Sequence, residues 1–281
     1  MKEKIILLDY ASNKYSQFGE DGIIAKILEI IPHNDKWCVE FGAWDGRVLS
    51  NTCRLIEESG YSAVLIEGDP IKYAELQSNF AENSKVVTIK EFINFDTCSL
   101  DKTLRQTNIP LNFDFLSIDI DGCDYHIWAS LNEYKPKVVC IEYNPTMSNE
   151  VRFIQEKNFS CAQGASISSI VELANDKGYN LICVTKNNAI FVCRDLYQHF
   201  DIEDNSIQTL RKDNSWVSHI FFGYDGSVTI LGANHNPWNG IALNRMIKQL
   251  PKKLRKFPGS MNLAEKKLLG LWKKVFRLSS R

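Results

Sequence analysis

Apolar residues recur along the first two thirds of the chain in patterns that predict alternating helices and strands. Over residues 20–31 isoleucine and leucine return every three or four positions, which predicts an amphipathic helix that ends before Pro32. Later apolar runs are short and have the length of buried strands. Strands are expected at 36–41, 62–67, 85–93, 113–119 and 137–143, with helices from Ser50 to Ser59, from 70 to about 82 and from about 166 to 177. Two further runs, 179–184 and 188–193, predict a β-hairpin.

This alternation favours the α/β class, with a mostly parallel central sheet, helices on both faces and an antiparallel edge hairpin. Residues 197–248 hold turn signals and aromatic runs, and we expect them to decorate the same domain. Residues 1–248 would then form one domain around a core at about 14–196, followed by a basic tail at 249–281. In an open parallel sheet ligands bind beyond the carboxyl ends of the strands, so the loops there are the place to look for chemistry.

The composition is that of an ordinary soluble globular protein, since 44% of the 281 residues are hydrophobic and 24% are charged. No apolar run has the length of a transmembrane helix, and the first residues lack the apolar core of a secretory signal. The eight cysteines include no Cys-x-x-Cys pair, and Cys38, Cys140, Cys183 and Cys193 lie in strand-like runs. We therefore expect buried thiols in a reducing cytoplasm rather than a zinc cluster.

The net charge of −1 conceals an asymmetry, because residues 245–281 contain 12 Lys or Arg and one acid, Glu265. Asn262 can cap a helix over 263–278 in which apolar residues and cations recur at helical spacing. The apolar residues are Leu268, Leu269, Trp272, Val275 and Phe276, and the cations are Lys266, Lys267, Lys273, Lys274 and Arg277. A basic amphipathic helix of this kind fits an anionic membrane surface. A helix docked on the acidic body and a dimer contact are the alternatives, whereas nucleic acid is disfavoured because no recognition motif accompanies the charge.

The loop after the first predicted strand reads Glu40-Phe41-Gly42-Ala43-Trp44-Asp45-Gly46. Its two glycines allow the backbone to approach a ligand closely, but the third glycine of a nicotinamide fingerprint is missing. The second strand ends at Glu67, before Gly68, and a carboxylate there can accept both hydrogen bonds of a ribose diol. These two loops predict a nucleotide-type cofactor site, and the alternative is an ordinary turn with a solvent-facing Glu67.

Acidic side chains follow the fourth and fifth predicted strands. Alternation along the fourth strand places Asp119 and Asp121 on one side, and the fifth strand ends in Glu142 and Asn144. Carboxylates crowded at one rim repel each other unless a cation or a proton lies between them, and such oxygens suit Mg²⁺, Mn²⁺ or Ca²⁺. The alternative is that the two aspartates bind substrate or cap the next helix.

His126 is expected in the first turn of the helix that follows this rim, where it is the best placed general base. A lone histidine more often has a structural role, so Asp119 and Asp121 stay in the set of candidate catalytic residues.

Five stretches of the chain carry a family resemblance. They are 15–22 (Tyr-Ser-Gln-Phe-Gly-Glu-Asp-Gly), 39–42 (Val-Glu-Phe-Gly), 50–52 (Ser-Asn-Thr), 117–125 (Ser-Ile-Asp-Ile-Asp-Gly-Cys-Asp-Tyr) and 139–144 (Val-Cys-Ile-Glu-Tyr-Asn). In this order they resemble the FkbM-type S-adenosylmethionine-dependent methyltransferases, in particular a branch found in bacterial gene clusters for surface (capsular) polysaccharides. The resemblance spans about residues 14–196 and implies a Rossmann-like methyltransferase fold. The glutamates typical of the family after the fourth strand are Asp121 and Asp124 here, which leaves the roles of these two positions open.

The resemblance implies S-adenosylmethionine as the cofactor and assigns roles by motif position. Gly42, Ala43 and Asp45 would surround its methionine part, and Asn51 and Thr52 would meet its carboxylate. Gln17 and Glu20 would close over the pocket, Glu67 would hold the ribose, and Ile93 and Asn94 would lie by the adenine. Three further residues are expected to bind the cofactor, namely Glu40, Gly68 and Asp119. Some related enzymes bind a divalent metal, Mg²⁺ or Mn²⁺, and Asp119, Glu142 and Asn144 match that arrangement, with Asp121 as a fourth ligand.

The expected activity is therefore O-methylation of a sugar hydroxyl on a nucleotide sugar or surface glycan, with or without a divalent cation. A nicotinamide-dependent sugar oxidoreductase and a non-catalytic module tethered by its basic tail are the competing hypotheses. We expect a cytoplasmic protein that can sit on the inner face of the cell membrane through its tail, and the sequence leaves a homodimer open.

Overall fold

The computed structural model describes residues 5–32, 35–95, 99–247 and 249–278. The chain divides into two compact units, Met1–Asp213 and Asn214–Arg281. The domain limit expected at residue 248 therefore falls inside the second unit. Residues 197–213 belong to the first unit, whereas the aromatic runs after them belong to the second.

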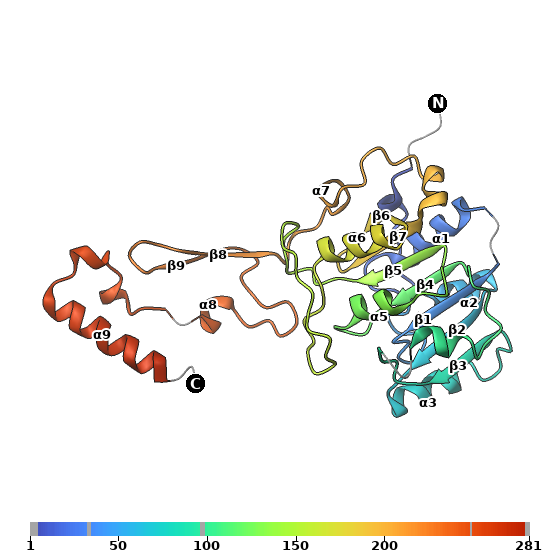
Figure 1. Ribbon diagram of the computed structural model, residues 1–281, viewed down its shortest axis with the longest axis horizontal. Helices are drawn as coiled ribbons and strands as arrows, with labels where there is room; N and C mark the ends of the chain where they lie inside the picture. Colours follow the sequence, from blue (N-terminus) through green and yellow to red (C-terminus); the bar gives the residue numbers. More distant parts are fainter. Residues whose placement is uncertain (1–4, 33–34, 96–98, 248, 279–281) are drawn as a thin grey trace. The chain divides into compact units, whose positions relative to one another are not determined.

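A seven-stranded sheet forms the centre of the first unit (Figure 1). Its strands are β1 (Trp37–Phe41), β2 (Ser62–Glu67), β3 (Val86–Lys90), β4 (Phe115–Ile118), β5 (Val138–Glu142), β6 (Tyr179–Val184) and β7 (Asn188–Cys193). They lie in the order β3-β2-β1-β4-β5-β7-β6. All pairs from β3 to β5 are parallel, and β7 is antiparallel to both of its neighbours. The expected α/β fold class, with a mostly parallel central sheet, helices on both faces and an antiparallel edge hairpin, is confirmed.

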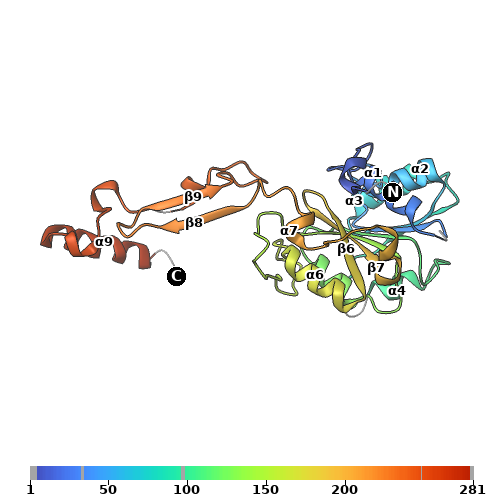
Figure 2. The ribbon, with the colours of Figure 1, turned by 90° about the horizontal axis from the view of Figure 1, so that it is seen from above.

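Helices cover both faces of this sheet. They are α1 (Glu20–Ile30), α2 (Cys53–Ser59), α3 (Pro70–Asn79), α4 (Leu100–Leu104), α5 (Asp124–Ser130), α6 (Ile167–Asp176) and α7 (Ile207–Leu210), with the 3₁₀ turns η1 (Leu7–Tyr10) and η2 (Arg194–His199). The apolar residues of α1, α2 and α3 belong to one buried cluster, and those of α4, α5 and α6 belong to another. Figure 2 shows these two groups of helices on opposite sides of the sheet.

Alternate residues of each strand enter the two clusters, which is why the strands read as continuous apolar runs. In β1, Cys38 packs with the α1 side and Val39 with the α5 side. The four cysteines expected in strands, Cys38, Cys140, Cys183 and Cys193, all lie there. Burial raises the pKa of the Cys38 and Cys140 thiols, so these side chains act as small apolar groups.

Local capping fixes where the helices around the site begin. Asp69 caps α3, because its carboxylate accepts the N–H groups of Ile71 and Lys72, both at 2.9 Å. Helix α2 begins at Cys53, later than the predicted start at Ser50. The Ser50 hydroxyl nevertheless accepts the N–H group of Cys53 at 3.0 Å, so Ser50 still covers the start of the helix.

The second unit contains a two-stranded antiparallel sheet of its own, β8 (Ser218–Phe222) with β9 (Val228–Gly232), joined by the turn that the sequence indicates. It continues through α8 (Leu243–Met246), η3 (Lys252–Leu254) and η4 (Pro258–Ser260) into α9 (Leu263–Leu278), which spans the predicted helix. Leu254 and Met261 are buried within it. Across the described residues, no helix has both the length and the apolar character needed to cross a membrane.

Candidate functional site

The sheet order reverses between β1 and β4, so a crevice is expected beyond the carboxyl ends of these two strands. The loops that follow β1, β2, β4 and β5 lie next to one another at this edge (Figure 1). They contain most of the residues that the sequence proposed for cofactor, metal and catalysis.

Gly42 is required by packing against the neighbouring strand. Its φ is +80°, and a Cβ added there would lie 2.0 Å from the carbonyl oxygen of Asp119. The N–H groups of Gly42 and Ala43 both donate to the Ile66 carbonyl at 3.1 Å. The glycine therefore brings the end of β1 close to the end of β4, and its predicted contact with a cofactor stays a prediction.

Glu67 joins the loops after β1 and β2. One carboxylate oxygen accepts the N–H of Trp44 at 2.8 Å, and the other accepts the N–H of Asp69 at 2.7 Å. Each oxygen has a second lone pair, so the carboxylate can also accept two hydroxyl hydrogen bonds from a ligand. The Trp44 ring is half exposed beside it, with the Lys72 ammonium 4.6 Å from the ring centre. Sequence reasoning missed this Trp44–Lys72 pair, in which Trp44 lies on the loop after β1 and Lys72 in the first turn of α3.

Glu40 is bonded to the loop that precedes α2. Its buried carboxylate accepts the hydroxyl protons of Ser50 and Thr52, at 2.5 and 2.8 Å, and the N–H of Asn51 at 2.7 Å. Burial raises its pKa. The Asn51 amide donates to Ser117 Oγ at 3.0 Å. These residues shape the loop before α2, and their expected contacts with a cofactor carboxylate stay predictions.

The segment before α1 is tied to the β6–β7 turn through Glu20. This carboxylate accepts the Thr185 hydroxyl at 2.6 Å, the Asn188 amide at 3.2 Å and the N–H of Phe18 at 2.7 Å. Gln17 is exposed, and with Phe18 and Thr185 it lines a hollow of about 410 Å³. This hollow lies between the segment before α1 and the β6–β7 turn, and the expected closure of Gln17 and Glu20 over a cofactor stays a prediction.

Three carboxyl groups gather where β4 and β5 end. Asp119, Asp124 and Glu142 each have an oxygen within 4.8 Å of the other two. Burial raises the pKa of all three, and the neighbouring acids raise it further. For Asp124 the pKa rises to about 6, although its oxygens accept the N–H groups of Ile120 and Gly122. Close carboxyl groups of this kind hold protons more tightly than isolated ones, or take up a cation.

The cluster differs from the metal set expected from the sequence, which stays a prediction. Asp121 is not among its members, because β4 ends at Ile118 and strand alternation no longer applies beyond it. Asp121 has a φ of +55° and is exposed, while Asp124 takes the inner position. Asn144 holds its own loop, since its amide oxygen accepts the N–H of Thr146 at 2.9 Å and its amide nitrogen donates to the Gln163 carbonyl at 2.8 Å.

His126 lies in the first turn of α5, as expected, and its ring is engaged by the protein. Its Nε2 lies 2.9 Å from the Gln155 carbonyl oxygen. A carbonyl only accepts, so Nε2 carries the proton and donates, which leaves Nδ1 as the atom that could act as a base. The ring also contacts Phe95 edge-on, with centroids 5.7 Å apart. His126 thus connects α5 to the loops after β3 and β5.

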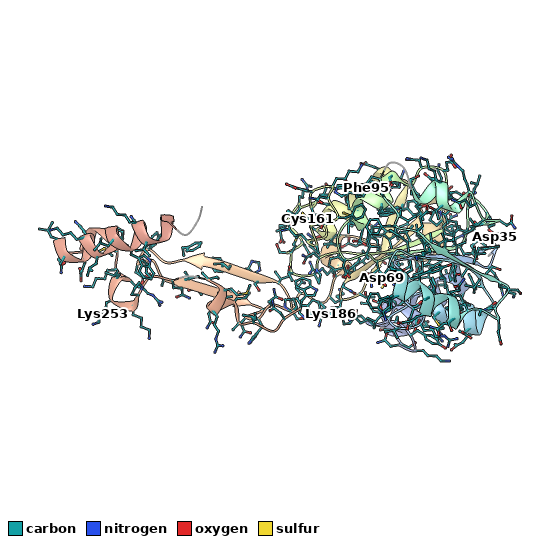
Figure 3. All side chains as sticks on the ribbon, turned by 90° about the horizontal axis from the view of Figure 1, so that it is seen from below. Asp35, Asp69, Phe95, Cys161, Lys186 and Lys253 are labelled. Atoms are coloured by element: carbon teal, nitrogen blue, oxygen red, sulfur yellow. The ribbon has the colours of Figure 1, made fainter. Side chains whose placement is uncertain are left out.

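An aromatic cluster, which the sequence analysis missed, joins those two loops. The Phe95 and Phe159 rings are stacked at 4.6 Å, and Phe92 meets Phe159 edge-on at 4.9 Å. Figure 3 labels Phe95 and Cys161, one from each loop. Phe92 is 61% exposed, whereas Ile93 beside it is buried in the core. Phe92 and Phe159 come from loops far apart in sequence, so no periodic signal could have paired them.

Gln155 fixes the conformation of the loop after β5, which carries Phe159. Its buried side chain accepts the N–H groups of Gln163 and Gly164, both at 2.8 Å, and donates to the Cys161 carbonyl at 3.0 Å. A Cβ added at Gly122 would lie 2.9 Å from that same carbonyl. The loop that carries Phe159 is therefore packed directly on the turn before α5, the helix that begins at Asp124.

Comparison with known proteins gives distant likenesses. The sequence matches no known family profile, and no curated protein is similar enough to count as a relative. Among solved structures, the N-terminal domain of EvdMO1 with SAH bound is 15% identical, with 66% of this chain and 82% of that one covered and a TM-score of 0.42. Precorrin-6y C5,15-methyltransferase from Geobacter metallireducens GS-15 is 13% identical, with 65% and 90% covered and a TM-score of 0.38. The CMeT domain of the citrinin polyketide synthase is 12% identical, with 62% and 51% covered and a TM-score of 0.43.

These likenesses are too distant to assign an activity. The function of this chain has to follow from its own residues at the edge of the sheet.

Proposed function

We propose that this protein is an S-adenosylmethionine-dependent methyltransferase that methylates a hydroxyl group of a nucleotide sugar or surface glycan. The observation that carries the proposal is the position of Glu67. Its buried carboxylate lies at the end of β2, is bonded to the loop after β1, and has lone pairs left for a ribose diol. The absence of a third glycine from the β1 loop favours this cofactor over a nicotinamide nucleotide.

S-adenosylmethionine supplies a methyl group already activated on a sulfonium, so the protein has to align an acceptor oxygen and remove its proton. Alignment contributes on the order of 7–11 kcal/mol to lowering such a barrier. As the O–CH₃ bond forms and the S–CH₃ bond breaks, the hydroxyl proton passes to a base. Asp119 fits that role because its raised pKa makes its ionised form a stronger base than an ordinary carboxylate. His126 Nδ1 and Asp121 are the other candidates.

The aromatic cluster supports a sugar acceptor. Phe92 and Phe159 expose ring surface next to the loop of Asp124, and aromatic faces pack well against the apolar C–H faces of sugar rings. Lys157, with its ammonium 4.8 Å from the Phe95 ring centre, adds a positive charge at the same place, which suits a nucleotide diphosphate. The FkbM-type resemblance of the motifs points to the same class of acceptor.

The acid cluster also fits a divalent cation. Three carboxylates within 4.8 Å of one another offer the oxygen ligands that Mg²⁺ and Mn²⁺ prefer. Asp119, Asp124 and Glu142 would hold the ion, which would lower the proton affinity of an acceptor hydroxyl. Chelation followed by metal add-back tests this part of the proposal. Full activity in excess chelator, with elemental analysis confirming metal-free protein, would leave Asp119, Asp121 or His126 as the base.

The activity itself is tested in two steps. Calorimetry with S-adenosylmethionine, its demethylated product SAH and a nicotinamide dinucleotide as separate ligands shows which cofactor the protein binds. Mass spectrometry of candidate nucleotide sugars incubated with protein and S-adenosylmethionine then looks for one added methyl group. Tight binding of the nicotinamide nucleotide with none of S-adenosylmethionine would overturn the proposal in favour of an oxidoreductase. Absence of binding by all three ligands would favour a non-catalytic module.

A further inference from the structure

Helix α9 carries an apolar stripe that its own unit leaves uncovered. Leu268, Leu271 and Val275 follow one another at spacings of three and four, so they lie on one face of the helix. Their exposed fractions are 53%, 60% and 63%. Leu269 and Trp272, on the adjoining face, are half-buried. The helix therefore packs within its unit through one part of its apolar surface and presents the other part outward.

Lysines border the outward stripe. Lys267 and Lys274, seven residues apart, lie on the same side of the helix, next to Leu271. The one acid of residues 245–281, Glu265, is paired with Lys256 at 2.6 Å. Lys267 and Lys274 therefore give the surface beside the stripe a positive charge.

The pattern of charge decides what kind of partner covers the stripe. A second copy of the helix would bring the same lysines against each other, and like charges in contact repel. An anionic lipid surface matches both features, because lysine stems extend along apolar groups while their ammonium groups reach the headgroups. We propose that α9 docks the protein on an anionic membrane, with Leu268, Leu271 and Val275 inserted and Lys267 and Lys274 at the phosphate level. This surface is independent of the proposed methyl-transfer site.

The test is co-sedimentation of the full-length protein with vesicles of phosphatidylcholine alone and with phosphatidylglycerol added. We expect binding to the anionic vesicles that weakens as salt is raised. The double variant Leu268→Asn/Leu271→Asn should bind at least about tenfold more weakly, because burial of each leucine is lost. The double variant Lys267→Glu/Lys274→Glu should also bind at least about tenfold more weakly, because each lysine removed lowers the affinity roughly fivefold.

Leu263→Asn is the matched control, because Leu263 is 81% exposed on the same helix but lies off the stripe. It should bind like the unaltered protein. Equal sedimentation of the unaltered protein and the double leucine variant would overturn the proposal, as would equal binding to neutral and anionic vesicles. Sedimentation velocity without lipid is the second readout. A dimer that the double leucine variant dissociates would assign the stripe to a second copy of the chain and also reject the membrane role.

Discussion

Glu67 is the residue on which the cofactor assignment depends most. It bonds to Trp44 and Asp69 on two loops, so it both shapes the crevice and offers acceptor sites to a ligand. We expect Glu67→Ala to lower the affinity for S-adenosylmethionine about 10- to 100-fold, since a hydrogen bond to a charged group contributes roughly 1.5–3 kcal/mol. Titration calorimetry measures the change, with the exposed Glu82→Ala as control.

The alanine variant also leaves two backbone N–H groups without their acceptor, so a second substitution is needed. Glu67→Gln retains one side-chain oxygen, so only one of the two N–H groups loses its acceptor. Weaker binding with an unchanged melting temperature in the glutamine variant would assign the loss to the ribose contact. If both variants bind the cofactor as tightly as the unaltered protein, the cofactor binds elsewhere.

The acid cluster makes stability depend on pH. Burial and mutual repulsion raise the pKa of Glu142 above its ordinary value, and that of Asp124 to about 6. The folded state thus binds protons more tightly than the unfolded state. The protonated cluster contributes fully to stability below the ordinary carboxyl pKa. This contribution is lost as the pH rises through 6 and beyond. In chelator, the free energy of unfolding should therefore fall between pH 5 and pH 9.

The Glu142→Gln substitution removes one titrating carboxyl group. The free energy of unfolding of this variant should therefore fall less steeply with pH than that of the unaltered protein. Urea denaturation over the pH series measures both slopes, and Glu82→Gln serves as an exposed control. Parallel slopes for all three proteins would show that the cluster does not titrate in this range. Added Mg²⁺ or Mn²⁺ should flatten the slope of the unaltered protein if the cluster binds a cation.

At the scale of elements, the sequence was most informative where a pattern repeats. The edge hairpin at 179–184 and 188–193 and the helix at 263–278 have the predicted bounds, because the apolar runs of the hairpin and the helical spacing of the helix persist through each of them. The acid rim was predictable only in part. Asp119 and Glu142 could be predicted because they lie directly at strand ends. The inward position of Asp124 is set by a turn that no repeat describes.

Substitution of Asp69 measures how much the capped first turn of α3 contributes to stability. Asp69 accepts two N–H groups there, and Pro70 occupies the first helical position. Asp69→Ala should lower the free energy of unfolding by about 1 kcal/mol, whereas Asp69→Ser should recover most of that loss. Urea denaturation at neutral pH compares the variants. A serine variant as unstable as the alanine variant would mean that Asp69 contributes through something other than capping.

At the scale of the whole molecule, the predicted site belongs to one unit. The residues assigned to cofactor, acid cluster and aromatic cluster run from Gln17 to Phe159, all within Met1–Asp213. Both faces of its sheet are covered by helices of the same unit. Residues 1–213 alone should therefore fold and bind S-adenosylmethionine as tightly as the full chain, which calorimetry and thermal denaturation can check.

The comparison with a chain of residues 1–248 makes this prediction specific. That chain keeps the β8–β9 ribbon but lacks η3, where Leu254 is buried, and α9. A two-stranded sheet is marginal on its own, and this one exposes Phe221 and Phe222. We expect residues 1–248 to aggregate more readily than residues 1–213, as light scattering on heating would measure. If 1–248 is instead the more soluble and only it binds the cofactor, the ribbon belongs with the first unit, as the sequence had suggested.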